Sequence, residues 1–104
     1  MITGFPSPAQ GYEDKTIDLN SLLIKHPSAT VFMQIDTNRY NRMGIYYGDL
    51  LTIDRSLPVK MESLVVFEAD GEFQLGRVFQ LSQETVICGV ITHVIHTVKG
   101  VYQQ

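Results

Sequence analysis

The feature that most constrains the fold of this chain is a series of short segments after Pro27 that are rich in Val, Ile, Phe and Thr. Such residues favour strands because β-branched and aromatic side chains pack well on a pleated surface. Asp70-Gly71 lies between two of these segments and is a typical hairpin signal. The predicted strands are Thr30–Ile35, Asp49–Asp54, Ser63–Glu68, Glu72–Leu81 and Glu84–Val98. We therefore expect a mostly β domain built as an antiparallel meander.

The last predicted strand differs from the others because it is apolar on both faces. Its residues Val86–Val98 do not alternate between apolar and polar side chains. This pattern is typical of a strand that lies inside a sheet or against another subunit.

The N-terminal part of the chain has a different character. Residues 1–15 contain two of the four prolines and few large apolar groups, which indicates an extended arm that Phe5 and Tyr12 could hold against a surface. Asp18 is a predicted N-cap, and Leu19, Leu22 and Leu23 follow at helical spacing before Pro27 ends the pattern. The expected domains are an arm at 1–15 and a single β domain at 16–104.

Composition and charge exclude several classes of function. The net charge is −3 and the 8 Lys and Arg residues are scattered, which argues against direct DNA binding. No apolar segment approaches the roughly 20 residues of a membrane span. The single cysteine, Cys88, cannot form an internal disulfide, which points to a reducing cytoplasm. His93 and His96 should point to opposite faces of a strand, so we expect no metal site, and no cofactor.

Many short motifs in one order resemble the UmuD branch of the LexA/UmuD family, whose members are S24-type peptidases. The match spans most of the chain and has almost no gaps before Leu81. The motifs are Gly4-Phe5-Pro6-Ser7-Pro8-Ala9, Ile17-Asp18-Leu19-Asn20, Leu22-Leu23-Ile24, His26-Pro27-Ser28-Ala29-Thr30, Gly44-Ile45, Gly48-Asp49-Leu50-Leu51, Asp70-Gly71-Glu72-Phe73, Gly89-Val90-Ile91 and His93-Val94.

The resemblance implies a dimerising β fold in which a Ser/Lys dyad cuts the protein's own chain. In that chemistry the serine hydroxyl attacks a peptide carbonyl, and a neutral lysine takes the proton. Counting from Gly44-Ile45 and Gly48-Asp49 places Arg39 at the position of the serine and Tyr40 at that of the following methionine. Counting from Asp70-Gly71 places Gly76 at the position of the lysine, with Arg77 beside it. The resemblance therefore implies a pseudopeptidase.

Two further departures from the family pattern concern the length of the chain. The family has a longer, hairpin-bearing segment between Leu81 and the last strand, whereas this chain has only Ser82–Cys88. Losing a strand exposes the edge of its neighbour, which must be paired, covered or blunted, and pairing with another chain is one solution. The Gly4-Phe5-Pro6 motif, which follows the self-cleavage bond in the family, stands near Met1, so we expect a form that is already processed.

The implied function is that of an inactive accessory or modulator of SOS mutagenesis, the error-prone (translesion) synthesis in which UmuD relatives join a Y-family polymerase. The expected partners are a second copy, an active UmuD-like subunit or a UmuC-like polymerase. Val90, Ile91 and Val94 of the last strand would form the dimer contact, with Phe5 and Tyr12 of the arm as a second contact.

Two other interpretations stay open. A regulator could engage a LexA-like repressor or the recombinase filament and change self-cleavage. A residual hydrolase could use another nucleophile, although no serine lies in a Gly-x-Ser-x-Gly elbow.

Tyr46-Tyr47 could equally anchor a partner or fill the core. Arg39, Tyr40 and Arg42 could line a reshaped groove or be exposed polar residues that drifted after catalysis ceased.

Overall fold

A computed structural model describes residues 16–98 of the chain. The predicted arm at 1–15, with Phe5 and Tyr12, lies outside the described residues. The described part confirms the mostly β class. It contains one short α-helix, α1 (Leu19–Leu23), and five strands: β1 (Thr30–Gln34), β2 (Leu50–Asp54), β3 (Leu64–Ala69), β4 (Glu72–Arg77) and β5 (Val86–Ile95).

Helix α1 begins where the sequence predicts. The Asp18 carboxylate accepts hydrogen bonds from the backbone N–H groups of Asn20 (3.1 Å) and Ser21 (3.5 Å). These bonds satisfy donors that a helix start leaves without partners. The helix ends at Leu23, earlier than predicted, and a 3₁₀ turn (Pro27–Ala29) then leads into β1.

The strands form one antiparallel sheet with the order β1-β2-β5-β3-β4. The predicted meander is wrong in one respect, because β5 lies between β2 and β3. The apolar character of β5 on both faces agrees with this central place. Strand β4 is also shorter than predicted, since a 3₁₀ turn, η3 (Val78–Gln80), replaces its last part. Residues 81–85 alone connect η3 to β5.

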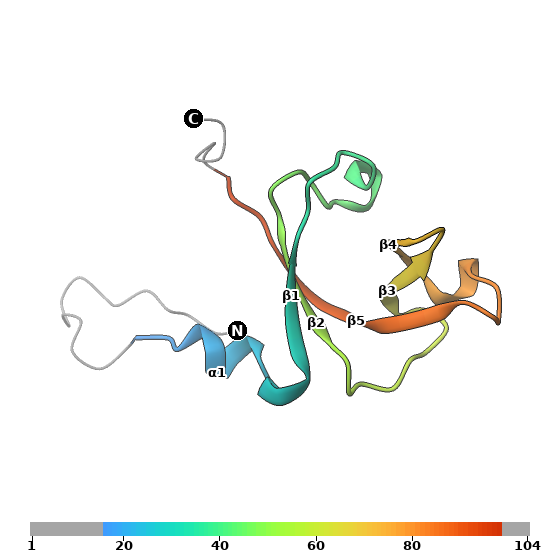
Figure 1. Ribbon diagram of the computed structural model, residues 1–104. Helices are drawn as coiled ribbons and strands as arrows, with labels where there is room; N and C mark the ends of the chain where they lie inside the picture. Colours follow the sequence, from blue (N-terminus) through green and yellow to red (C-terminus); the bar gives the residue numbers. More distant parts are fainter. Residues whose placement is uncertain (1–15, 99–104) are drawn as a thin grey trace.

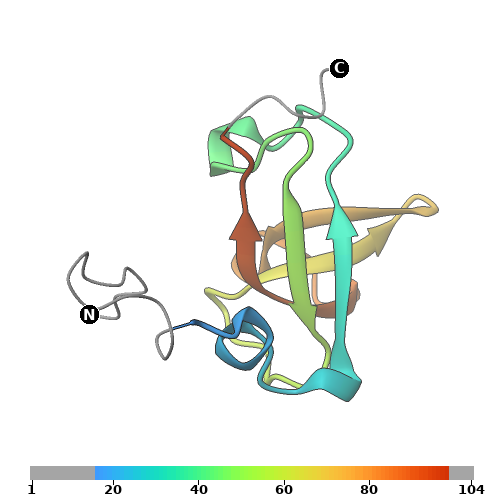
Figure 2. The ribbon, with the colours of Figure 1, turned by 90° about the vertical axis from the view of Figure 1, so that its left-hand side faces the viewer.

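Strand β5 runs through two layers of the sheet (Figures 1 and 2). Its first residues pair with β3, and its last residues pair with β2. The register shifts between Thr52 and Ile53 against β5, and again between Val66 and Phe67. A Cβ at Gly89 would lie 2.6 Å from Cγ2 of Ile53, so glycine allows the close approach at this crossing.

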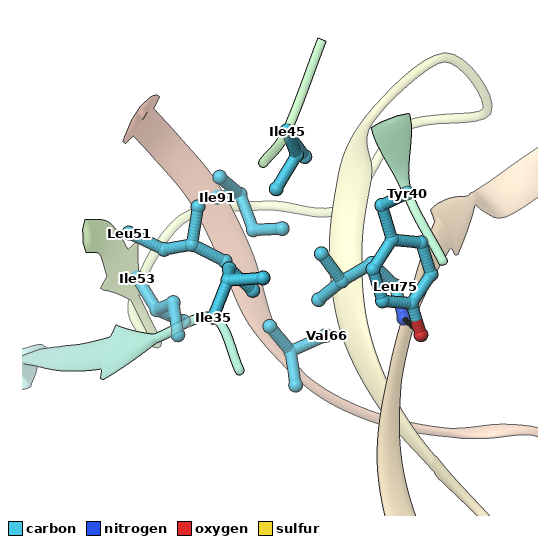
Figure 3. Close-up of a cluster of buried hydrophobic side chains, with 8 residues drawn as sticks. All are labelled: Ile35, Tyr40, Ile45, Leu51, Ile53, Val66, Leu75 and Ile91. Carbon is cyan, nitrogen blue, oxygen red and sulfur yellow. Dashed lines mark hydrogen bonds between the residues drawn. The ribbon is translucent and has the colours of Figure 1, made fainter. Parts of the chain in front are cut away.

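The core fills the space between the two layers (Figure 3). Leu51 and Val66 are fully buried, and so is Ile45 from the loop before β2. The cluster consists of Ile35, Tyr40, Ile45, Leu51, Ile53, Val66, Leu75 and Ile91. Tyr40 belongs to this cluster although it lies in the turn where the family resemblance places catalytic residues, so the core reaches directly into the candidate site.

Candidate degenerate peptidase site

The turn after β1 and strand β4 meet at the position where the resemblance places the catalytic dyad. Tyr40 is 9% exposed, and its hydroxyl accepts a hydrogen bond from the backbone N–H of Leu75 at 3.2 Å. Figure 3 shows the two residues side by side. The 3₁₀ turn η2 (Asn41–Met43) follows Tyr40 and ends at Gly44, whose φ of 80° is left-handed. Chain segments far apart in sequence are therefore joined here by a tyrosine.

Arg39 points along the surface toward the start of β4. Its guanidinium lies 3.5 Å from the Glu72 carboxylate, and both side chains are more than half exposed. An exposed pair of this kind contributes little to stability, because water screens both charges. Tyr40 and then Glu72 raise the pKa of Arg39 above its usual value. The Arg39 side chain is therefore a permanent cation.

Gly76 has little room for a larger side chain. A Cβ built there would lie 3.2 Å from Cε1 of Phe67 and 3.6 Å from Cδ2 of Leu81. Arg39 instead contacts Glu72 at the beginning of the same strand. The structure thus brings together the turn and the strand to which the resemblance assigns the dyad, and the contacts between them are those of Tyr40 with Leu75 and of Arg39 with Glu72.

A cleft runs between β1 and β4 beside these residues. One part of this cleft has a volume of about 230 Å³, and its lining includes Arg39, Tyr40 and Glu72. A larger apolar groove of about 510 Å³ adjoins it, and both are lined by Met33 and Phe73. The arrangement offers surface for binding, and neither Arg39 nor Gly76 carries a hydroxyl nucleophile or an amine base.

Two histidine–aspartate pairs, which were not predicted from the sequence, join the two ends of β2 to other segments of the chain. Nδ1 of His96 lies 2.5 Å from a carboxylate oxygen of buried Asp49. Nδ1 of His26 lies 2.6 Å from Asp54. The hydroxyl of Ser56, followed by His26, lowers the pKa of Asp54 to about 2. The partners are 47 and 28 residues apart, so no local pattern could reveal these pairs.

The structure also shows where His93 and His96 lie, the two histidines that were considered as metal ligands. His93 lies against Thr52, with Nδ1 3.1 Å from its hydroxyl, whereas His96 faces Asp49. Among residues 16–98 no group of three or more His, Cys, Asp and Glu side chains could hold a metal ion.

The predicted dimer residues of β5 occupy different environments. Ile91 is 9% exposed and belongs to the core cluster, and Val90 is half-buried between β2 and β3. Val94 is 39% exposed, and the adjacent Ile95 is similarly open. Tyr47 is 60% exposed, so it is a surface residue. Of the three predicted contact residues, Val94 is therefore the one most accessible to a partner.

Comparison with known proteins gives several matches. The family model described as Peptidase S24-like matches residues 1–87. ImpA of Salmonella typhimurium is 36% identical over 114 aligned residues, which cover 92% of this chain and 79% of ImpA. SamA of Salmonella typhimurium strain LT2 is 33% identical over 114 aligned residues, which cover 93% of this chain and 81% of SamA. MucA of Escherichia coli is 42% identical over 74 aligned residues, which cover 71% of this chain and 51% of MucA.

These alignments also bear on chain length. The alignments with ImpA and SamA extend over 114 positions, whereas this chain has 104 residues. The relatives therefore carry residues within the aligned stretch that this chain lacks.

No helix of the described segment has the length and apolar character needed to cross a membrane.

Proposed function

Because this chain belongs to the peptidase S24-like family, on its UmuD-like branch, we propose that it acts by protein–protein binding in SOS mutagenesis and cuts no peptide bond. The observation that carries the proposal is the Tyr40–Leu75 hydrogen bond, which occupies the meeting point of the turn and β4. On either side of this contact, Arg39 and Gly76 stand where the family has its serine and lysine. The protein is an accessory or modulator of an error-prone polymerase.

The chemistry of these two residues supports an inactive site. A guanidinium has no lone pair to attack a carbonyl and stays protonated at ordinary pH. Glycine has no side chain to accept a proton. Nucleophilic catalysis needs an activated nucleophile with a base in hydrogen-bond reach. A peptide held in the cleft would therefore be bound without being cut.

The exposed end of β5 is the surface we assign to a partner subunit. Val94 and Ile95 are 39% and 41% exposed, and Tyr46 and Tyr47 are exposed residues of the loop before β2. His96 connects the two segments, because it bonds to Asp49 and its ring lies 5.3 Å from that of Tyr46. Exposed apolar and aromatic side chains are typical contact residues of protein interfaces. The partner is a UmuD-like subunit, as a homodimer or heterodimer, with a UmuC-like polymerase as a further partner.

Light scattering tests the binding surface. The protein is measured alone and then mixed with a catalytically competent UmuD-like protein. We expect a complex with that protein, and we expect Val94→Lys to abolish it. Val59→Lys is the matched control, because Val59 is 44% exposed in the loop between β2 and β3. If Val94→Lys leaves every complex intact while the fold is retained, the surface assignment is wrong. Capture of a LexA-like repressor in place of these partners would support the regulator instead.

Restoring the dyad tests the inactive site. We expect the double variant Arg39→Ser, Gly76→Lys to remain without peptidase activity, because Tyr40 and the Phe67 ring still occupy the space around it. A serine-reactive probe should label neither this variant nor the parent protein. Labelling of the folded parent, lost on unfolding, would show a residual hydrolase and contradict the proposal.

A further inference from the structure

The buried polar side chains of the described residues all lie on β2 or directly before it. They are Asp49, Thr52 and Asp54. Each of them is bonded to Nδ1 of a different histidine. In the same order, these partners are His96, His93 and His26. Because the chain has three histidines, every one of them is anchored at this strand.

The pair of His96 with Asp49 differs from the other two in its charge balance. Thr52 is neutral, and the Asp54 carboxylate also accepts bonds from the amide and the hydroxyl of Ser56. Asp49 accepts the Tyr46 N–H on Oδ2 at 2.8 Å, and Nδ1 of His96 contacts Oδ1. Among the described residues no lysine or arginine pairs with Asp49. Within this part of the chain, His96 is therefore the residue that can balance the charge of this buried carboxylate.

The charge of His96 depends on a proton that solvent can reach. A carboxylate only accepts hydrogen bonds, so Nδ1 carries a hydrogen whether the ring is charged or neutral. The proton that sets the charge is therefore the one on Nε2. No hydrogen bond of the described residues engages Nε2 of His96, and the side chain is 47% exposed. Histidine changes charge between about pH 5 and pH 8, so this pair can change charge without losing the Nδ1 bond.

Few other titratable groups surround this ring. From the loop before β2, Tyr46 places its ring 5.3 Å from that of His96. On β5 itself, His93 is bonded to Thr52 and Thr92 instead. Asp36 follows the residue whose N–H bonds to the Asp49 carbonyl, but no bond joins its side chain to His96. Among the described residues, Asp49 is therefore the charged group in contact with His96.

We propose that His96 and Asp49 form a proton-sensitive latch, which holds the end of β5 against the loop before β2 more strongly when Nε2 is protonated. A charge-assisted hydrogen bond is roughly twice as strong as a neutral one. When the proton leaves, the buried carboxylate loses its balancing charge, and the loop that Asp49 holds through the Tyr46 N–H opens more easily.

The latch lies within the surface that we assign to a partner subunit, so its effect on binding rests on the proposed function. Val94 and Ile95 precede His96 on β5, and Tyr46 belongs to the same surface. A partner that covers this surface removes water from the pair. Removing water from a balanced ion pair costs less than removing it from an unbalanced carboxylate. The partner should therefore bind more tightly when His96 carries its charge.

Hydrogen exchange followed by NMR tests the latch in the protein alone. Protection of the Tyr46 amide, corrected for its intrinsic rate, should fall about fivefold from about pH 6 to about pH 8, together with the titration of the His96 ring signals. His96→Gln keeps a donor for Asp49 but cannot change charge, so its protection should be equal at both pH values.

The matched control is His26→Gln, because His26 pairs with an aspartate at the other end of β2. This variant should keep the pH dependence of the wild type at Tyr46. A flat wild-type profile, or the same fall in His96→Gln, overturns the proposal. Loss of the pH dependence in His26→Gln overturns it as well.

Binding measurements separate the latch from the proposed function. The Kd for a catalytically competent UmuD-like protein should be about fivefold lower at about pH 6 than at about pH 8, and His96→Gln should remove this difference. An equal difference in both proteins overturns the effect on binding. If no complex forms at either pH while Tyr46 keeps its pH-dependent protection, the proposed function fails and the latch is supported. If the complex forms and Tyr46 protection is flat, the latch fails and the proposed function survives.

Discussion

Removal of one hydroxyl group, in Tyr40→Phe, should measurably destabilise the protein. The Tyr40 hydroxyl accepts the Leu75 N–H at 3.2 Å in a buried contact, and the ring itself is 9% exposed. Phenylalanine keeps the packing but leaves that N–H without an acceptor. An unsatisfied buried donor costs about 1–3 kcal/mol. This is a substantial part of the roughly 5–15 kcal/mol that stabilises a typical domain.

Two measurements check this prediction. Thermal unfolding followed by circular dichroism should show a lower Tm, by about 4–8 °C for each kcal/mol lost in a domain of this size. Hydrogen exchange should show faster exchange of the Leu75 amide than in the parent protein. Tyr47→Phe is the control, because Tyr47 is 60% exposed and its substitution should change stability by less than about 0.5 kcal/mol. Unchanged Tm and unchanged exchange of the Leu75 amide would show that the hydroxyl does not satisfy the Leu75 N–H.

Three other outcomes follow from the structure. Gly89→Ala should lower the free energy of unfolding by about 1–3 kcal/mol in urea titration, because the new Cβ would lie 2.6 Å from Ile53; an unchanged midpoint would contradict the close approach. The folded pKa of Asp54, about 2, lies below the unfolded value of about 3.9, so its stabilisation is present above pH 4 and is lost as the pH falls toward 2. Asp54→Asn should remove that part of the acid dependence of the urea midpoint, and identical profiles would refute the assignment. His96→Ala should cost about 1–3 kcal/mol in the same titration, because buried Asp49 loses a partner; a change below about 0.5 kcal/mol would show that the pair is unimportant.

Local chemistry explains why several elements could be predicted from the sequence. The Asp18 cap, the Asp70-Gly71 hairpin and the apolar runs each depend on residues close together in the chain. The end of β4 at Arg77 could not be predicted, because Phe79 and Leu81 continue the strand-like pattern beyond it. Only the structure shows that η3 interrupts that pattern.

The candidate site was predictable only in part. The resemblance located Arg39 and Gly76 by counting, but it could not show that the tyrosine beside Arg39 is bonded to β4. That contact joins residues 35 positions apart and depends on how the sheet bends. Ile91 illustrates the same limit: its sequence context fits a dimer strand, whereas its 9% exposure places it in the core of the monomer.

The central place of β5 has a consequence for biosynthesis. A ribosome makes a chain from its N-terminus, so β5 emerges after the other four strands of the described residues. Until then β2 and β3 lack the strand that joins them, so β1–β2 and β3–β4 can form only as separate pairs. Contacts between distant segments also form slowly. A chain truncated before Val86 therefore cannot assemble this sheet.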